Sequence, residues 1–149
     1  MSHNIDHVIL RAMTLEELVL LGPLWEAAGL SYRPQGRDTQ QNLADQWTAN
    51  RDGFIGAFHG VDLVGSVLAT EDGRRGWINR LVVHPDYRRL GLGHRLIITA
   101  EQMLKEKGLL LIAALVEDTN DASRAVFSRA GYELMPEVLY YSKRESPDA

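Results

Sequence analysis

The residues whose types and spacing could perform chemistry are concentrated in one short turn, from His84 to His94. A strongly apolar run ends at Val83, just before this turn, and a long amphipathic pattern typical of a helix begins at Leu92. A strand that ends in a basic, glycine-bearing turn and opens a helix directs free backbone N–H groups and the positive end of the helix dipole to one point. The ligand expected at such a point is a phosphate or a pyrophosphate.

Two familiar nucleotide-binding motifs are excluded by this turn. The dinucleotide fingerprint requires a third glycine at the position of Leu96, and a Walker A loop requires Gly-Lys followed by Ser or Thr, which the chain lacks. The pattern that remains is Arg88-x-x-Gly91-x-Gly93. Its glycines let the backbone approach an anion where a Cβ would collide, and Arg88 and Arg89 add positive charge. An adenine-nucleotide site is also compatible with these residues.

The hydrophobic periodicity predicts the elements that position the turn. A capping box at Thr14 opens a helical pattern that Gly22-Pro23 kinks or splits, and Asp38-Thr39 caps a second helix. Asp72-Gly73 between two strand-like runs predicts a hairpin. The expected strands are 7–10, 54–59, 63–70, 76–83, 109–116, 132–134 and 138–142, and the helices that follow the turn are 92–107 and 120–130. The run 109–116 is almost continuously apolar, which predicts a strand buried on both faces.

Composition limits the class of protein. The chain has 149 residues, no cysteine and a formal net charge of -4. The charge argues against a nucleic-acid-binding surface, and the lack of cysteine excludes disulfides, thiol catalysis and zinc–thiolate sites. Because no apolar run approaches the ~20 residues that span a bilayer and no signal-peptide pattern is present, we expect one cytoplasmic domain over residues 1–149 with no membrane partner. His3 and His7 are four residues apart, but no helix pattern covers them, and we expect no metal.

The turn and its flanking elements resemble the GNAT superfamily of N-acyltransferases. The acyl-CoA-binding motif of that family is Arg/Gln-x-x-Gly-x-Gly/Ala after an apolar strand, and this sequence matches every fixed position. The order of strands and helices resembles the family over essentially the whole chain. The resemblance implies an α/β fold of the α+β type, with a mostly antiparallel central sheet, about four flanking helices and a splayed parallel pair, 76–83 and 109–116, that forms a cleft for acetyl-CoA as co-substrate.

The resemblance also implies roles for individual residues. In this family the end of the strand before the turn pairs with the pantetheine arm, so the Val83 N–H would polarise the thioester carbonyl as a one-donor oxyanion site. In the family, an Asn at the start of the later helix bonds the pantetheine, and the corresponding residue here is Asn120. Asn is also a favoured helix cap. The CoA contacts implied in this way are Leu81, Val82, Val83, Arg88, Arg89, Leu90, Gly91, Leu92, Gly93, His94, Asn120 and Phe127.

The expected substrate pocket follows from strand alternation. Residues 77, 79, 81 and 83 should share one face of their strand, which would place Trp77 and Asn79 in the pocket beside the cleft. Arg37, in the variable loop before the second helix, is expected to face an anionic group or solvent there.

The usual acid and base of the family are absent. Phe127 stands where the family has its general-acid tyrosine, and Trp77, Asn79 and Leu115 occupy its usual base positions. Glu117, Glu71 or Asp72 could accept the proton through water, and Tyr132, Tyr140 or Tyr141 could replace the acid. Alternatively the amine arrives deprotonated and the thiolate leaves unassisted, with Asn79 orienting the amine or a water, and this is the alternative that we favour.

The sequence therefore predicts an N-acetyltransferase that moves an acetyl group from acetyl-CoA to a primary amine of a small molecule or a protein, by direct attack in a ternary complex. The competing class is a non-catalytic acyl-CoA-binding sensor or partner protein, which Phe127, Trp77 and Leu115 favour. Nucleic acid is not an expected partner. A homodimer is compatible with the resemblance, because dimers are common in the family.

Overall fold

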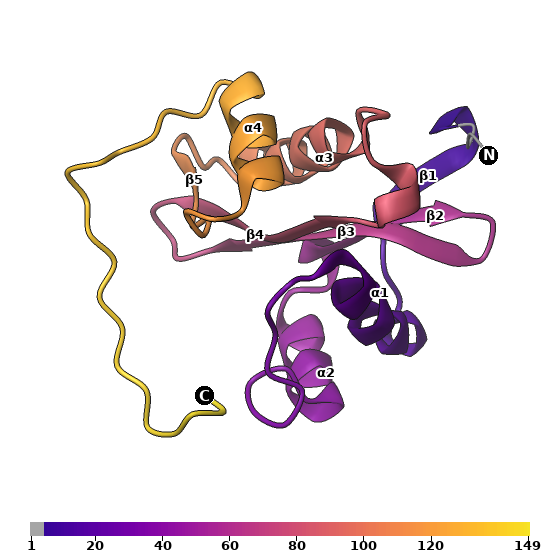
Figure 1. Ribbon diagram of the computed structural model, residues 1–149, viewed down its shortest axis with the longest axis horizontal. Coiled ribbons are helices and arrows are strands. Elements are labelled where there is room, and N and C mark those ends of the chain that lie inside the picture. The colour runs from indigo at the N-terminus through magenta and orange to yellow at the C-terminus, as the bar shows by residue number, and fades with distance from the viewer. Residues whose placement is uncertain (1–4) are drawn as a thin grey trace.

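The computed structural model describes residues 5–149, and within that range five strands form one sheet in chain order (Figure 1). The strands are β1 (Val8–Ala12), β2 (Phe54–His59), β3 (Asp62–Glu71), β4 (Gly76–Val83) and β5 (Ile112–Ala114). Neighbouring strands pair antiparallel, except β4 and β5, which pair parallel. The α-helices are α1 (Leu21–Ala28), α2 (Gln40–Ala49), α3 (Leu92–Glu106) and α4 (Asp121–Arg129). This confirms the predicted fold class.

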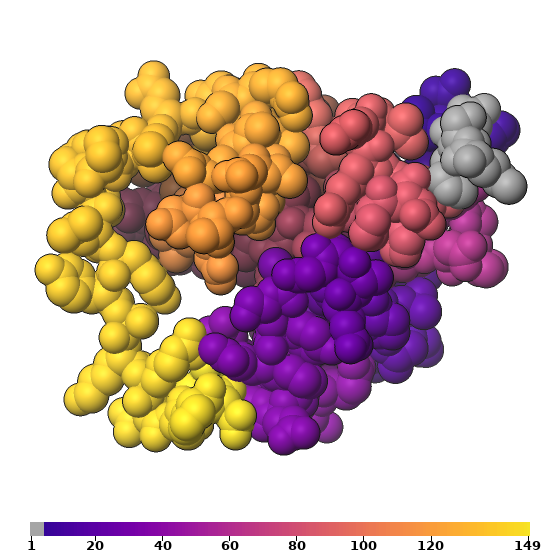
Figure 2. Space-filling view, in the orientation of Figure 1, coloured from indigo at the N-terminus to yellow at the C-terminus, as the bar shows by residue number. Residues whose placement is uncertain are grey.

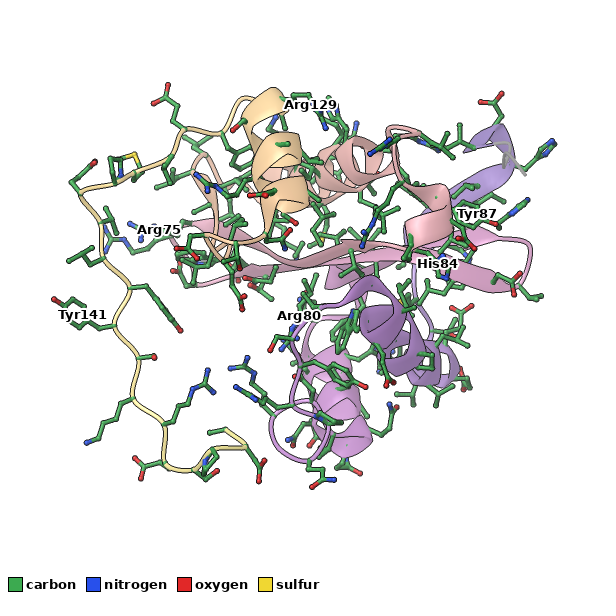
Figure 3. All side chains as sticks on the ribbon, in the orientation of Figure 1. Arg75, Arg80, His84, Tyr87, Arg129 and Tyr141 are labelled. Atoms are coloured by element: carbon green, nitrogen blue, oxygen red, sulfur yellow. The ribbon has the colours of Figure 1, made fainter. Side chains whose placement is uncertain are left out.

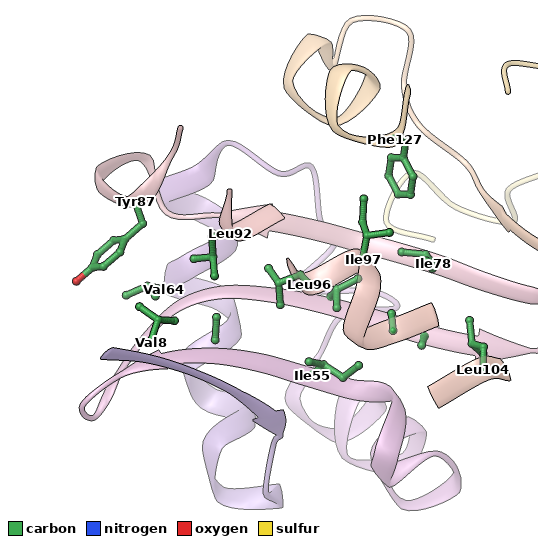
Figure 4. Packing of buried hydrophobic residues seen from close by; sticks show 14 of the residues in the cluster. Val8, Ile55, Val64, Ile78, Tyr87, Leu92, Leu96, Ile97, Leu104 and Phe127 are labelled. Carbon is green, nitrogen blue, oxygen red and sulfur yellow. The ribbon is translucent and has the colours of Figure 1, made fainter. Parts of the chain in front are cut away.

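The two faces of the sheet are covered by different helices, with α1 and α2 on one side and α3 and α4 on the other (Figure 1). On the α3 side, the apolar stripe of that helix is fully buried at Leu96, Ile97, Ala100 and Leu104 (Figure 4). Gly108, at φ +84°, follows the helix and ends it. The stripe fixes α3 on the sheet, and so fixes the direction of its N-terminus.

On the other face, α1 and α2 cover a second buried cluster that includes Trp25, Leu43 and Phe58. The predicted cap of α2 is present, because the Thr39 hydroxyl accepts the Asn42 N–H at 3.1 Å. The two helices are joined by residues 29–39, which contact β4 at Arg80. We call residues 29–38 the connecting loop.

A β-bulge interrupts β4 at Arg80. Val82 pairs with Ser66 but Asn79 pairs with Leu68, so two residues of β4 stand opposite one residue of β3. Arg80 has φ +55°, which is the left-handed region of the backbone. The strand therefore changes its facing pattern at this point.

The bulge makes the predicted alternation wrong. Ile78 faces the α3 core, so Trp77 and Asn79 lie on the opposite, α1–α2 face. After the bulge, Leu81 and Val83 pack against the α3 core. The four residues expected on one face are thus divided between two, because the extra residue shifts the period of two by one.

The parallel pair β4–β5 is short and then separates. Its pairing extends only from Gly76 opposite Ile112 to Ile78 opposite Ala114, whereas β4 continues to Val83. The splay that the resemblance implied is therefore present, although β5 is shorter than the predicted strand 109–116.

The two predicted closing strands, 132–134 and 138–142, are wrong: the described chain is irregular after α4. Beyond Gly131, at φ +94°, the chain runs along the outside of the molecule and ends near the connecting loop (Figures 1 and 2). Apolar alternation shows that a segment can form a strand, but not that a partner edge lies within reach. Because these residues do not cover β5, the run 109–116 is not buried on both faces, and Leu110 and Leu115 are exposed.

Residues 5–149 contain no group of three or more His, Cys, Asp and Glu side chains that could hold a metal ion. They also contain no helix that is both long and apolar enough to cross a membrane. His3, one of the two spaced histidines, lies outside the described residues.

Candidate active site

A cavity of about 1260 Å³ lies where β4 and β5 separate. On one side, which we call the turn side, it is lined by residues of the turn 87–93 and of the segment 115–127. On the other, the loop side, it is lined by residues of α1, of the connecting loop and of α2. Residues 79–83 of β4, which have no β5 beside them, connect the two sides.

The turn presents backbone N–H groups to the cavity. Arg89 and Gly91 both adopt left-handed conformations, at φ +66° and +79°, a geometry in which successive N–H groups form a concave anion site. Gly91 is the N-cap of α3 and has no side chain with which to cap it. The first N–H groups of α3 are therefore left for a ligand.

Arg88 has a structural part in this turn that its position in the motif did not reveal. Its Nε donates to the Val83 carbonyl at 3.2 Å, and its Nη2 donates to the Ala28 carbonyl at 3.1 Å. The guanidinium thus fastens the turn to the end of β4 and to the end of α1, while its positive charge remains at the cavity.

Gly93 is not required by the packing of the protein itself. A Cβ at this position would meet Val126 at 3.5 Å, which is ordinary van der Waals contact. Its φ also lies outside the left-handed region that favours glycine. The remaining physical reason for a glycine is the close approach of a ligand to the backbone, and this fits a phosphate group on the turn.

The Val83 N–H points to the cavity side of β4. The next residue, His84, donates its N–H to the Val64 carbonyl of β3 at 2.8 Å. Because N–H groups alternate in direction along a strand, the Val83 N–H is directed away from β3, to the side where β5 has separated. It is therefore placed to bind an oxygen in the cavity.

Asn120 and Phe127 line the turn side together with Glu117. The Asn120 side-chain oxygen accepts the Ser123 N–H at 3.1 Å and caps α4, which leaves its amide nitrogen to donate to a ligand. Phe127 is buried and has no proton to donate. A helix cap and a ligand contact are thus compatible at Asn120.

The tyrosines considered as substitute acids lie outside the cavity lining. Tyr132 packs edge-to-face on Phe127, with ring centroids 5.1 Å apart, and burial raises the pKa of its hydroxyl. Tyr140 and Tyr141 are exposed on the outlying C-terminal segment (Figure 3). The structure does not bring these hydroxyls to the parted strands.

Two of the three carboxylates considered as bases also lie elsewhere. Asp72 accepts the N–H groups of Arg75 and Arg74 in the β3–β4 hairpin, and these bonds, with the Trp77 indole N–H, lower its pKa to about 2. Glu71 accepts the Gly73 N–H in the same hairpin. Glu117 is the carboxylate of the three that lines the cavity.

The predicted substrate residues are divided. Asn79 and Arg37 line the cavity, and the Asn79 amide donates to the Thr70 hydroxyl at 3.3 Å. Trp77 lies outside it, bonded to the hairpin. Of the predicted CoA contacts, Leu90 and His94 also lie outside the cavity lining, whereas the other ten line it.

The loop side also contains an ion pair that the motifs and the family resemblance do not predict. Arg80 of the bulge donates to both carboxylate oxygens of Asp38, in the connecting loop, at 3.0 Å each. Figure 3 shows Arg80 on the side of β4 that faces this loop. The signal in the sequence is the polar pair Asn79-Arg80 inside an apolar strand, which is unusual enough to indicate a bulge or a buried ion pair.

Comparison with known proteins agrees with this geometry. The model of the "Acetyltransferase (GNAT) family" matches residues 21–132. An acetyltransferase of Sodalis glossinidius (strain morsitans) is 32% identical over 136 residues, which are 91% of this chain and 92% of that protein.

Two solved structures share the fold. One is the PaiA N-acetyltransferase from Thermoplasma acidophilum in complex with coenzyme A (TM-score 0.75, 20% identity, 86% of this chain and 91% of that one). The other is an aminoglycoside acetyltransferase from an uncultured soil metagenomic sample in complex with sisomicin (TM-score 0.75, 18% identity, 96% and 100%). The fold is thus that of N-acetyltransferases. The chain itself belongs to the GNAT family of acetyltransferases, and it is an enzyme of that class.

Proposed function

We propose that this acetyltransferase moves an acetyl group from acetyl-CoA to a primary amine, on a small molecule or a protein, by direct attack in a ternary complex. The observation that carries the proposal is one cavity that joins the uncapped start of α3 to the part of β4 that has lost its partner strand. An anion site and an adjacent bare strand edge are what a long donor with a pyrophosphate and an amide-containing arm requires.

The residues present fit coenzyme A. The N–H groups of residues 89–94 would hold the pyrophosphate, and the side chain of Arg89 would add charge. The backbone of Leu81 and Val83 would pair with the pantetheine amides, and the Asn120 amide nitrogen would donate to the same arm. The thioester supplies an activated acetyl group, so the enzyme needs no nucleophile of its own.

The reaction forms a C–N bond and breaks the C–S bond. The amine nitrogen attacks the thioester carbonyl while the Val83 N–H donates to its oxygen, where negative charge develops. The thiolate leaves with the electron pair of the C–S bond and takes a proton from solvent. The extra proton of the amine passes to a water molecule that Asn79 orients. Glu117 can then accept this proton from the water.

A thiol-release assay tests the proposal. Acetyl-CoA is mixed with the enzyme and with spermidine, L-lysine or a peptide that has a free N-terminal amine, and free CoA is measured against time. We expect thiol release that depends on both an amine and the enzyme. Saturable CoA binding without such release from any amine would overturn the enzymatic proposal, and ATP competing better than CoA would overturn the assignment of the donor.

A non-catalytic acyl-CoA-binding role is the second candidate. Phe127 favours it, because a ring without a hydroxyl lines the cavity where the family has its acid. The same assay separates the two candidates, since a binder saturates with CoA and releases no thiol.

A further inference from the structure

The Asp38–Arg80 pair joins two segments that are far apart in the sequence. Besides its two bonds to Asp38, the Arg80 guanidinium donates to the Ser31 carbonyl at 3.2 Å and lies over the Trp25 ring, 4.9 Å from its centroid. Asp38 in turn accepts the Arg33 N–H at 2.6 Å. One strand residue thus holds the connecting loop at two residues, Ser31 and Asp38.

Asp38 is buried, Arg80 is partly buried, and their opposite charges compensate each other. The side chains of Arg80 and Asp38 are 17% and 6% exposed. Burial lowers the pKa of Arg80, and the Asp38 charge opposes this effect. Arg80 and the Arg33 N–H donate to the two oxygens of Asp38, so the charge of this carboxylate is already compensated within the protein.

The position of the pair connects the loop to the chemistry. Arg80 is the bulged residue between Asn79, which lines the cavity, and the segment of β4 that ends in the Val83 N–H. Arg37 and Asp38 line the same cavity from the loop. A shift of the loop would therefore move the wall on which an amine must rest, while the turn that faces the CoA pyrophosphate stays in place.

We propose that the Asp38–Arg80 pair is a positioning device for the acceptor: it fixes the connecting loop against the β4 bulge, so that the amine is held in reach of the thioester carbonyl. This rests on the proposed acetyl transfer. Neither residue exchanges a proton or contacts the thioester. Their contribution lies in the placement of the amine, where a misplacement of about 1 Å can cost about 100-fold in rate.

The chain offers a matched control for a merely structural role. Arg11 donates to both carboxylate oxygens of Glu17, at 2.8 and 2.6 Å, and its guanidinium lies over the Phe58 ring at 4.0 Å. This second pair also joins an arginine on an aromatic ring to a carboxylate, but it connects β1 to residues 15–20 and lies outside the cavity lining.

The experiment measures kcat and KM for whichever of the three amines releases thiol, the Kd of CoA, and Tm. The variants are Asp38→Asn, Arg80→Gln, Arg80→Lys and the double variant D38N/R80Q, with Arg11→Gln and Glu17→Gln as controls. We expect kcat/KM for the amine to fall at least about tenfold in D38N and R80Q, with the Kd of CoA within about twofold of wild type. R80K should be intermediate, because an ammonium keeps the charge beside Asp38 but has no second nitrogen for the Ser31 carbonyl.

The outcomes separate the two proposals. The double variant removes both charges, so it remains folded if a single variant does not, and it should still show the loss specific to the amine. If folded variants keep wild-type kcat/KM, or if CoA affinity falls as much as amine turnover, the positioning role is wrong while the acetyl transfer stands. If the control pair gives the same loss, the effect is one of stability and the positioning role is also wrong. A wild-type enzyme that releases no thiol with any amine overturns both.

Discussion

The turn side and the loop side of the cavity offer different groups to a ligand. The turn side offers backbone N–H groups, which a short run of sequence places by itself through two left-handed residues and a helix start. The loop side offers side chains, and its central ion pair joins residues 42 positions apart in the chain. A donor common to a whole family can be held by main chain, whereas an acceptor that varies must be recognised by side chains that tertiary structure brings together.

The first prediction concerns the turn and has the largest effect. Replacing Gly91 with Val should weaken CoA binding at least about 100-fold, because a β-branched residue cannot hold φ +79° without moving the N–H groups. The Kd of CoA can be measured by isothermal titration calorimetry. Gly60→Val is the matched control, since Gly60 has φ +64°, open space around it and a place in the β2–β3 hairpin.

Unchanged CoA affinity in the Gly91 variant, or an equal loss in the Gly60 variant, would contradict the assignment of the turn. Gly93→Ala sharpens the test, because the protein itself has room for that methyl group. We expect Tm to stay constant while CoA binding weakens about tenfold.

The second prediction compares the two ion pairs by stability. Asp38→Asn leaves the partly buried Arg80 charge without its carboxylate and should lower the free energy of unfolding by about 2–3 kcal/mol, below the range for a fully buried pair. Glu17→Gln should cost less than about 1 kcal/mol, because the side chain of Arg11 is 44% exposed. Urea unfolding monitored by tryptophan fluorescence measures both. Equal losses of unfolding free energy in the two variants would mean that the Asp38–Arg80 pair stabilises the protein no more than the exposed Arg11–Glu17 pair does.

The third prediction concerns the missing acid. Phe127→Tyr adds a hydroxyl to a ring that lines the cavity, and kcat should rise between about two- and tenfold if departure of the thiolate limits the rate. Tyr132→Phe, outside the cavity lining, should leave kcat unchanged. Steady-state thiol release at saturating substrates measures both variants. A fall in kcat at unchanged Tm for F127Y would show that the cavity requires the shape of the Phe127 ring and that a hydroxyl at this position does not act as an acid.

The smallest effect is a pH dependence at the control pair. Hydrogen bonds from Arg11, and then from the Thr14 N–H, lower the pKa of Glu17 to about 2, below its ordinary 4.5. A carboxyl whose pKa is lowered by folding stabilises the protein above its unfolded pKa and loses that effect as pH falls. The stability difference between wild type and Glu17→Gln should therefore be constant above pH 4.5 and shrink as the pH approaches about 2. A difference that grows on acidification would contradict the ion pair.

A local sequence pattern was sufficient to predict those elements whose structure depends on a single segment of the chain. The stripe of α3, the bounds of β2 and β4 and the cap of α2 follow from period, turn residues and caps, and all were predicted. The bulge at Arg80 could not be predicted from alternation, because an extra residue shifts the period of two without changing the apolar pattern on either side. Residues 132–142 have the composition of strands, but in the described chain they pair with no other strand. Composition alone does not indicate whether a partner strand lies within reach. The splay of β4 and β5 was reached through the family resemblance, not through the periodicity of either strand.

The most direct test of the central claim is amine-dependent release of CoA thiol from acetyl-CoA by the wild-type enzyme, measured beside the Kd of CoA for the same preparation. The account predicts saturable CoA binding together with thiol release that rises with the concentration of at least one primary amine and stops when the amine is omitted. Saturable binding with the same rate of thiol release at every amine concentration would contradict it.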